Sequence, residues 1–134
     1  MTVKAVPGNA AGIPGSKEVA VVAARAAAAK QGADIAILDV HELIVITDFF
    51  VIASGSSDRQ VKTIVDEVEK AVRERGVRPI RREGETENRW VLLDYVDVVV
   101  HVFADEERDY YDLERLWRDA PRVRWQDSDA ASSG

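Results

Sequence analysis

The sequence contains no cysteine and only two histidines among its 134 residues. The absence of cysteine excludes disulfide bonds, thiolate zinc sites and a cysteine nucleophile. No apolar run approaches the roughly 18 residues that a membrane-spanning helix needs. The N-terminal residues also lack the basic and apolar regions of a secretory signal. We therefore expect a soluble, non-secreted chain in a reducing cytoplasm.

Basic residues are fewer than acidic ones, 18 against 24, so the formal net charge is -6 and the isoelectric point is about 4.9. Nucleic-acid binding depends on lysines and arginines that displace counterions from phosphates. An acidic chain is a poor candidate for that role, and we expect no sequence-specific contact with nucleic acid. It suits a basic protein partner, although the same charge can simply keep a protein in solution.

The apolar content is sufficient for one folded domain, since 46% of the residues are hydrophobic. Composition divides the chain into a flexible leader at residues 1–15, a folded domain at residues 16–118 and a flexible C-terminal tail at residues 119–134. Hydrophobic periodicity within the domain predicts helices at residues 16–31, 57–76 and 105–121 and strands at residues 35–40, 49–54, 78–82, 90–94 and 98–103. This order, αββαβββα, predicts an α+β fold in which helices flank a mixed five-stranded sheet.

One short loop, Gly55-Ser56-Ser57, gives a weak enzymatic signal. It follows a strand and opens a helix, as phosphate-binding loops and the Gly-Ser pairs of nucleotidyltransferases do. Two-metal phosphoryl transfer also needs neighbouring carboxylates, but the only Asp-x-Asp spacing lies in the tail at Asp127 and Asp129. Capping of the helix by Ser57, with Gln60 three residues later, is the simpler interpretation. A nucleotide-binding enzyme that uses Gly55 and Ser56 is kept as the alternative, and we expect no metal or cofactor.

Other residue types that often catalyse reactions also have simple structural roles here. His101 lies within an apolar strand, where a neutral, hydrogen-bonded histidine is expected. Asp94 and Asp97 flank a tight turn, where carboxylates commonly cap backbone amides. The acidic start of the last predicted helix, from Asp105, favours the positive end of the helix dipole. None of these residues predicts a catalytic site.

The strand at residues 90–94 is the best candidate for a binding surface. Alternation places Trp90, Leu92 and Asp94 on one side of the sheet, and Val91, Leu93 and Tyr95 on the other. If the tryptophan side is exposed, an aromatic anchor with carboxylates at its rim has the composition of a protein-interaction hot spot. If a helix covers that side, Trp90 belongs to the core. The sequence leaves both options open.

The chain resembles the ribosomal silencing factor family, also called the Iojap-like family, over residues 16–118. The shared motifs are TDFFVIASG at residues 47–55 with Ser57, Arg59, Gln60 and Val61; WVLLDY at residues 90–95; DVVVHVF at residues 97–103; and Arg108, Tyr111, Leu113, Glu114, Leu116 and Trp117. The resemblance implies a fold similar to nucleotidyltransferases without their catalytic carboxylates. The family's turn commonly reads Asp-x-Gly-Asp, whereas this chain has Val96 at the glycine position.

The resemblance also implies a function. Family members bind ribosomal protein uL14 on the large ribosomal subunit, block joining of the small subunit, and lower translation in stationary phase or starvation. They often form homodimers when free. By this resemblance we expect a non-enzymatic bacterial factor. Its uL14-binding residues would be Trp90 and Leu92 as the apolar anchor, with Asp94, Tyr95 and Asp97 at the rim.

Overall fold

A computed structural model of the chain describes residues 15–107 and 118–126. The elements are helices α2 (Ser16–Ala29) and α3 (Asp58–Arg73) and strands β1 (Ala33–Asp39), β2 (Phe49–Gly55), β3 (Arg81–Glu83), β4 (Trp90–Asp94), β5 (Val98–Ala104) and β6 (Arg122–Val123). No helix within the described ranges is long and apolar enough to cross a membrane.

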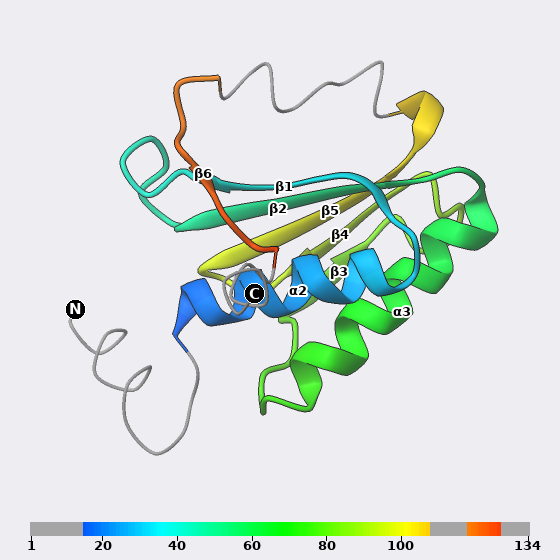
Figure 1. The fold of residues 1–134 in the computed structure, drawn as a ribbon. Helices are drawn as coiled ribbons and strands as arrows, with labels where there is room; N and C mark the ends of the chain where they lie inside the picture. Colours follow the sequence, from blue (N-terminus) through cyan, green and yellow to red (C-terminus); the bar gives the residue numbers. More distant parts are fainter. Residues whose placement is uncertain (1–14, 108–117, 127–134) are drawn as a thin grey trace, which may run out of the picture.

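The strands form one mixed sheet in the order β3-β4-β5-β2-β1-β6 (Figure 1). Strands β2 and β5 run parallel, and every other neighbouring pair is antiparallel. The α3 helix lies between β2 and β4 in sequence, so it carries the chain across the sheet. The predicted α+β class and mixed sheet are confirmed.

Both helices pack against the same face of the sheet, below it in Figure 1. The α2 helix is rich in alanine, and Ala20, Ala23 and Ala24 are fully buried. Such small side chains let a helix approach its neighbours closely. The α3 helix buries a stripe of branched side chains, which comprises Val61, Ile64, Val65, Val68 and Val72. The predicted stripe therefore forms much of the main core.

The start of α3 is capped as the sequence predicts, with one difference. The Ser57 hydroxyl accepts a hydrogen bond from the Gln60 backbone N–H at 3.1 Å. A capping box would return the Gln60 side chain to the N–H of Ser57. Here Gln60 Oε1 instead accepts from Ser56 N at 2.6 Å, and Gln60 Nε2 donates to the carbonyls of Lys30 and Gln31. The Gln60 side chain thus ties the end of α2 to the start of α3.

The predicted strand count is one too low, because residues 122–123 form the sixth strand. Within β6, Val123 pairs with Ile37 of β1, and the Asp39 N–H donates to the Pro121 carbonyl at 2.8 Å. Part of the segment predicted as a flexible tail therefore belongs to the sheet. A two-residue strand has no periodicity of its own, since its conformation is set by pairing with β1.

One other predicted element differs from the structure, and two predicted segments are described only in part or not at all. The strand expected at residues 78–82 is Arg81–Glu83, which pairs with β4 from Arg81 opposite Asp94 to Glu83 opposite Leu92. The last predicted helix is helical at residues 105–107. The remainder of that helix up to residue 117, and the predicted leader through residue 14, lie outside the described residues.

Candidate partner-binding surface

Strand β4 separates its side chains between the two faces of the sheet, as its alternation predicts. Val91 and Leu93 are fully buried beneath the helices. Trp90, Leu92 and Asp94 are half-buried and point to the opposite face. Trp90 there packs against a second apolar cluster of Leu38, Val40, Ile52, Phe103 and Ala120. Trp90 is therefore neither sealed in the main core nor fully exposed.

The indole of Trp90 is held in one orientation by two aromatic neighbours. Its ring stacks on Phe103, which lies opposite it on β5, with centroids 4.9 Å apart and planes 26° apart. Its Nε1–H donates to His101 Nδ1 at 3.2 Å. Because an indole nitrogen can only donate, Nδ1 must be the acceptor and His101 must carry its proton on Nε2. The stack and the hydrogen bond together pre-organise the tryptophan.

His101 is a neutral core histidine, which confirms the prediction. Its side chain is 6% exposed and lies edge-on to Phe50, with centroids 4.9 Å apart. Burial lowers the pKa of the imidazole to about 4, because a charged ring would lose its hydration. Its Nε2 has no hydrogen-bond partner in the part of the chain that the structure describes. These features fit structural support of Trp90 and give no sign of acid–base chemistry at neutral pH.

Asp94 maintains the turn after β4 through its carboxylate, and Asp97 does so through its backbone. Asp94 Oδ2 accepts from Arg81 Nη2 at 2.9 Å, and its Oδ1 accepts from the Val96 N–H at 2.8 Å. The backbone carbonyl of Asp97 accepts from Asp48 N and Phe49 N, which joins the turn to the start of β2. Asp94 thus caps the turn, as one interpretation of the sequence predicted, and it also forms an ion pair with Arg81.

Tyr95 does not belong on the partner surface, contrary to the sequence-based expectation. Its side chain is 7% exposed and packs in the main core with the helices. Burial raises the pKa of its phenol above the ordinary value, and its hydroxyl has no hydrogen-bond partner among the described residues. Alternation along the strand had already placed Tyr95 with Val91 and Leu93. The name β4 surface is used below for the four remaining residues: Trp90, Leu92, Asp94 and Asp97.

Sequence patterns missed a concentration of exposed apolar side chains at one end of the sheet. The five large hydrophobic residues that are exposed in the described ranges are Leu43, Val45, Ile46, Ile80 and Val96. All lie where β1 and β4 end and β2, β3 and β5 begin. Asp94 and Asp97 lie at the same end, so the β4 surface adjoins these side chains. The apolar run at residues 43–46, placed between two polar segments, was the available signal.

The residues of the Gly55-Ser56-Ser57 loop cap helix α3 and pack closely against it. A Cβ at Gly55 would lie 3.0 Å from the Val61 backbone nitrogen, so a larger residue would crowd the contact between strand and helix. The side chains of Ser56 and Ser57 both engage Gln60. Across residues 15–107 and 118–126, no three His, Asp or Glu side chains are grouped to hold a metal ion. This arrangement favours capping over nucleotide binding.

Comparison with known proteins gives a consistent result. Residues 14–134 match the family model described as "Ribosomal silencing factor during starvation". The ribosomal silencing factor RsfS of Bacillus subtilis is 45% identical over 105 residues, which cover 78% of this chain and 89% of that protein. The chloroplastic protein Iojap of Zea mays is 36% identical over 78% of this chain and 45% of its own length. A crystal structure of a Chromobacterium violaceum protein superposes with a TM-score of 0.73 at 40% identity, over 75% of this chain and 84% of that one.

Proposed function

This chain belongs to the ribosomal silencing factor family, and from that premise we propose that it binds ribosomal protein uL14 through the β4 surface. Docked there, it blocks the small subunit sterically and represses translation in stationary phase or starvation. It acts in the bacterial cytoplasm as an obstacle without catalytic turnover. When free, it forms a homodimer.

The observation that carries the proposal is the half-buried, oriented indole of Trp90 on the face away from the helices. A binding hot spot is commonly a large aromatic side chain that is fixed before binding and surrounded by polar groups. Pre-organisation lowers the entropy that is lost on association. Leu92 extends the apolar contact along β4, and Asp94 and Asp97 complete the surface at the far end of the strand.

Charge supports a basic partner for this surface. The chain carries a net charge of -6, and acidic residues lie close to the apolar side chains at this end of the sheet. Complementary charge accelerates encounter and fixes orientation more than it raises affinity. We therefore expect uL14 to contribute apolar contacts to Trp90 and cationic side chains near Asp97.

The test is co-sedimentation and titration with purified large subunits. Trp90→Ala should weaken binding by at least about 2 kcal/mol, which corresponds to roughly thirtyfold in Kd. A charge-reversing substitution on the uL14 surface should cause a similar loss with the wild-type chain. Thermal unfolding of each variant shows whether the fold persists.

Trp125→Ala is the matched control. Trp125 is also a partly buried tryptophan, but it packs against the main core on the helix side of the sheet. This variant should bind the subunit like wild type. If folded Trp90→Ala retains full affinity, Trp90 does not contact uL14. Turnover of ATP in the presence of magnesium, lost on substitution of Ser57, would instead support the nucleotide-binding alternative.

A further inference from the structure

A hollow lined mainly by arginine lies between the end of α3 and the edge strand β3. Its volume is about 340 Å³, and Glu69 and Arg73 of α3 face the segment that leads into β3. The residues that line it are Glu69, Arg73, Arg78, Pro79, Ile80, Arg81 and Arg82. We call this feature the arginine hollow. Four of its side chains are cationic and one is anionic, which reverses the charge balance of the whole chain.

Two of these arginines are held in place by carboxylates of the protein itself. Arg82 Nη1 lies 2.5 Å from Glu69 Oε1, and its Nε lies 2.8 Å from Glu85 Oε2. Arg81 Nη2 lies 2.9 Å from Asp94 Oδ2, and its Nε lies 3.4 Å from Glu83 Oε2. These pairs orient the two guanidinium groups along β3 and neutralise much of their charge.

The other two arginines, Arg73 and Arg78, are different. Both are exposed, and neither forms an ion pair with any residue that the structure describes. A guanidinium group offers forked N–H donors that match the oxygens of a phosphate. Two such groups that face one hollow, neither of them paired with a carboxylate among the described residues, form a site suited to a phosphate.

We propose that the arginine hollow binds a phosphate of the ribosomal RNA backbone when the chain is docked on the large subunit. The inference rests on the proposed function and adds a second contact to it. Arg81 lines the hollow and also pairs with Asp94 of the β4 surface, whereas Glu69 and Arg73 lie on the helix face of the sheet, opposite the face of Trp90. The hollow therefore lies at the β3 edge of the sheet, next to the Asp94 end of the β4 surface, where it can reach the part of the subunit that flanks the protein partner. There, a basic protein would be repelled by the hollow, whereas RNA phosphates would be attracted.

The test compares affinity at several salt concentrations for the full chain and an Arg73→Gln/Arg78→Gln double variant. Each phosphate contact adds about 0.7 to 0.9 to the slope of log affinity against log salt concentration. The double variant should bind large subunits about tenfold more weakly at low salt, with a slope shallower by about one to two. Binding to isolated uL14, which contains no RNA, should be unchanged.

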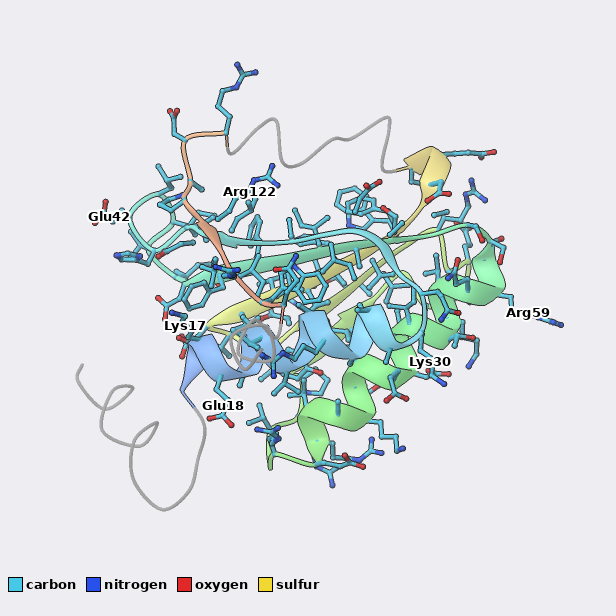
Figure 2. All side chains as sticks on the ribbon, in the orientation of Figure 1. Lys17, Glu18, Lys30, Glu42, Arg59 and Arg122 are labelled. Carbon is cyan, nitrogen blue, oxygen red and sulfur yellow. The ribbon has the colours of Figure 1, made fainter. Side chains whose placement is uncertain are left out.

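The control variant is Lys30→Gln/Arg59→Gln, which removes the same amount of charge at the opposite end of α3. Figure 2 shows Lys30 and Arg59 together at that end, while Glu18, the partner of Arg75 near the end of α3, lies at the other. This control should keep the wild-type slope.

An unchanged slope in the Arg73 and Arg78 variant would overturn the phosphate site and leave the proposed function standing. An equal loss on isolated uL14 would assign the hollow to protein contact and also overturn it. Failure of the wild-type chain to bind subunits at all would remove both proposals.

Discussion

At the scale of single residues, the imidazole of His101 links stability to pH. It accepts the indole N–H of Trp90 only while Nδ1 is unprotonated. Its buried position keeps it neutral, with a pKa of about 4 in the folded chain against roughly 6.5 in an unfolded chain. Between these values the unfolded chain binds a proton that the folded chain does not.

This difference fixes the direction of the pH effect. The contribution of His101 to the free energy of unfolding is fully present above about pH 6.5. It is lost as the pH falls towards 4, because protons then bind preferentially to the unfolded chain. The loss is on the order of 3 kcal/mol, from the folded-state pKa of about 4. Urea unfolding at pH 7, 6, 5 and 4.5 measures it. His101→Gln cannot titrate, so its free energy of unfolding should fall less steeply over this range.

His41 provides a control with the opposite sign. It is exposed, and its hydrogen bond with Asp39 raises the pKa of its imidazole. Any stability that it contributes is therefore present at low pH and lost as the pH rises through the raised pKa. His41→Gln should leave the loss of stability below pH 6.5 in place. If His101→Gln keeps the full wild-type slope, another group is responsible for it.

At the scale of elements, the turn between β4 and β5 shows how a local departure from a family pattern is tolerated. Val96 has φ of 74°, which is the left-handed region that favours glycine. Its side chain is 48% exposed, so little packing holds it there. The hydrogen bond from Val96 N to Asp94 Oδ1 and that from Tyr95 N to the Val98 carbonyl maintain the turn. The turn thus keeps the conformation that glycine would adopt, at the cost of strain in a β-branched residue.

Substitution with glycine should therefore stabilise the protein. The left-handed conformation costs an L-residue about 1–2 kcal/mol, and the added entropy of glycine in the unfolded chain offsets about 0.5–1 kcal/mol of that gain. We expect Val96→Gly to raise the free energy of unfolding by about 0.5–1 kcal/mol in urea titrations. Val45→Gly, at a 96% exposed loop position outside the positive-φ residues, should not stabilise. Equal effects of the two substitutions would show that strain at Val96 is not the cause.

The elements that could be predicted from the sequence are those whose own side chains specify them. The α3 stripe and the alternation of β4 follow from burial on one side of a helix or strand. By contrast, β3 is exposed along its whole length and β6 has only two residues. Their strand conformation comes from pairing with β4 and β1, which no local pattern records. The alternation of β4 identified the candidate surface and the resemblance to a known family gave it a partner, but Tyr95 was included against the alternation of its own strand.

The arginine hollow could not be predicted for a related reason. Its residues come from α3, from the segment that leads into β3 and from β3 itself, and they meet only because β3 adds to the edge of the sheet beside β4. In the sequence, Arg73 favours the negative end of a helix, and Arg81 and Arg82 belong to a charged stretch. Which of these arginines pair with a described carboxylate becomes visible only from the positions of Glu69, Glu85 and Asp94 in space.

At the scale of the whole molecule, an early strand and the last strand of the described chain, β1 and β6, pair at one edge of the sheet. Strand β1, close to the N-terminus, has β2 on one side and β6 on the other. Without β6, the outer edge of β1 would expose unpaired backbone groups that can pair with another chain. The short C-terminal strand therefore covers the part of this edge that contains the apolar pair Ile37 and Leu38.

A variant that ends at Ala120 tests this role of β6. It retains Ala120, which is buried in the second cluster, and removes β6 with its backbone contacts. We expect a lower free energy of unfolding, by about 1–3 kcal/mol, and self-association that increases with concentration. Sedimentation velocity and urea titration measure both effects. A variant that ends at Gln126 keeps β6 and should behave like the full chain, and identical behaviour of the two truncations would contradict the prediction.

The parallel pairing of β2 with β5 has a consequence for how the protein is made. Val51 pairs with Val100, and the intervening residues include α3, β3 and β4. During synthesis, β2 emerges well before β5 exists, so the backbone edge of β2 that pairs with β5 stays uncovered until β5 leaves the ribosome. Contacts between such distant segments slow folding. Nascent chains halted between the two strands should therefore be the form of this protein most dependent on chaperones.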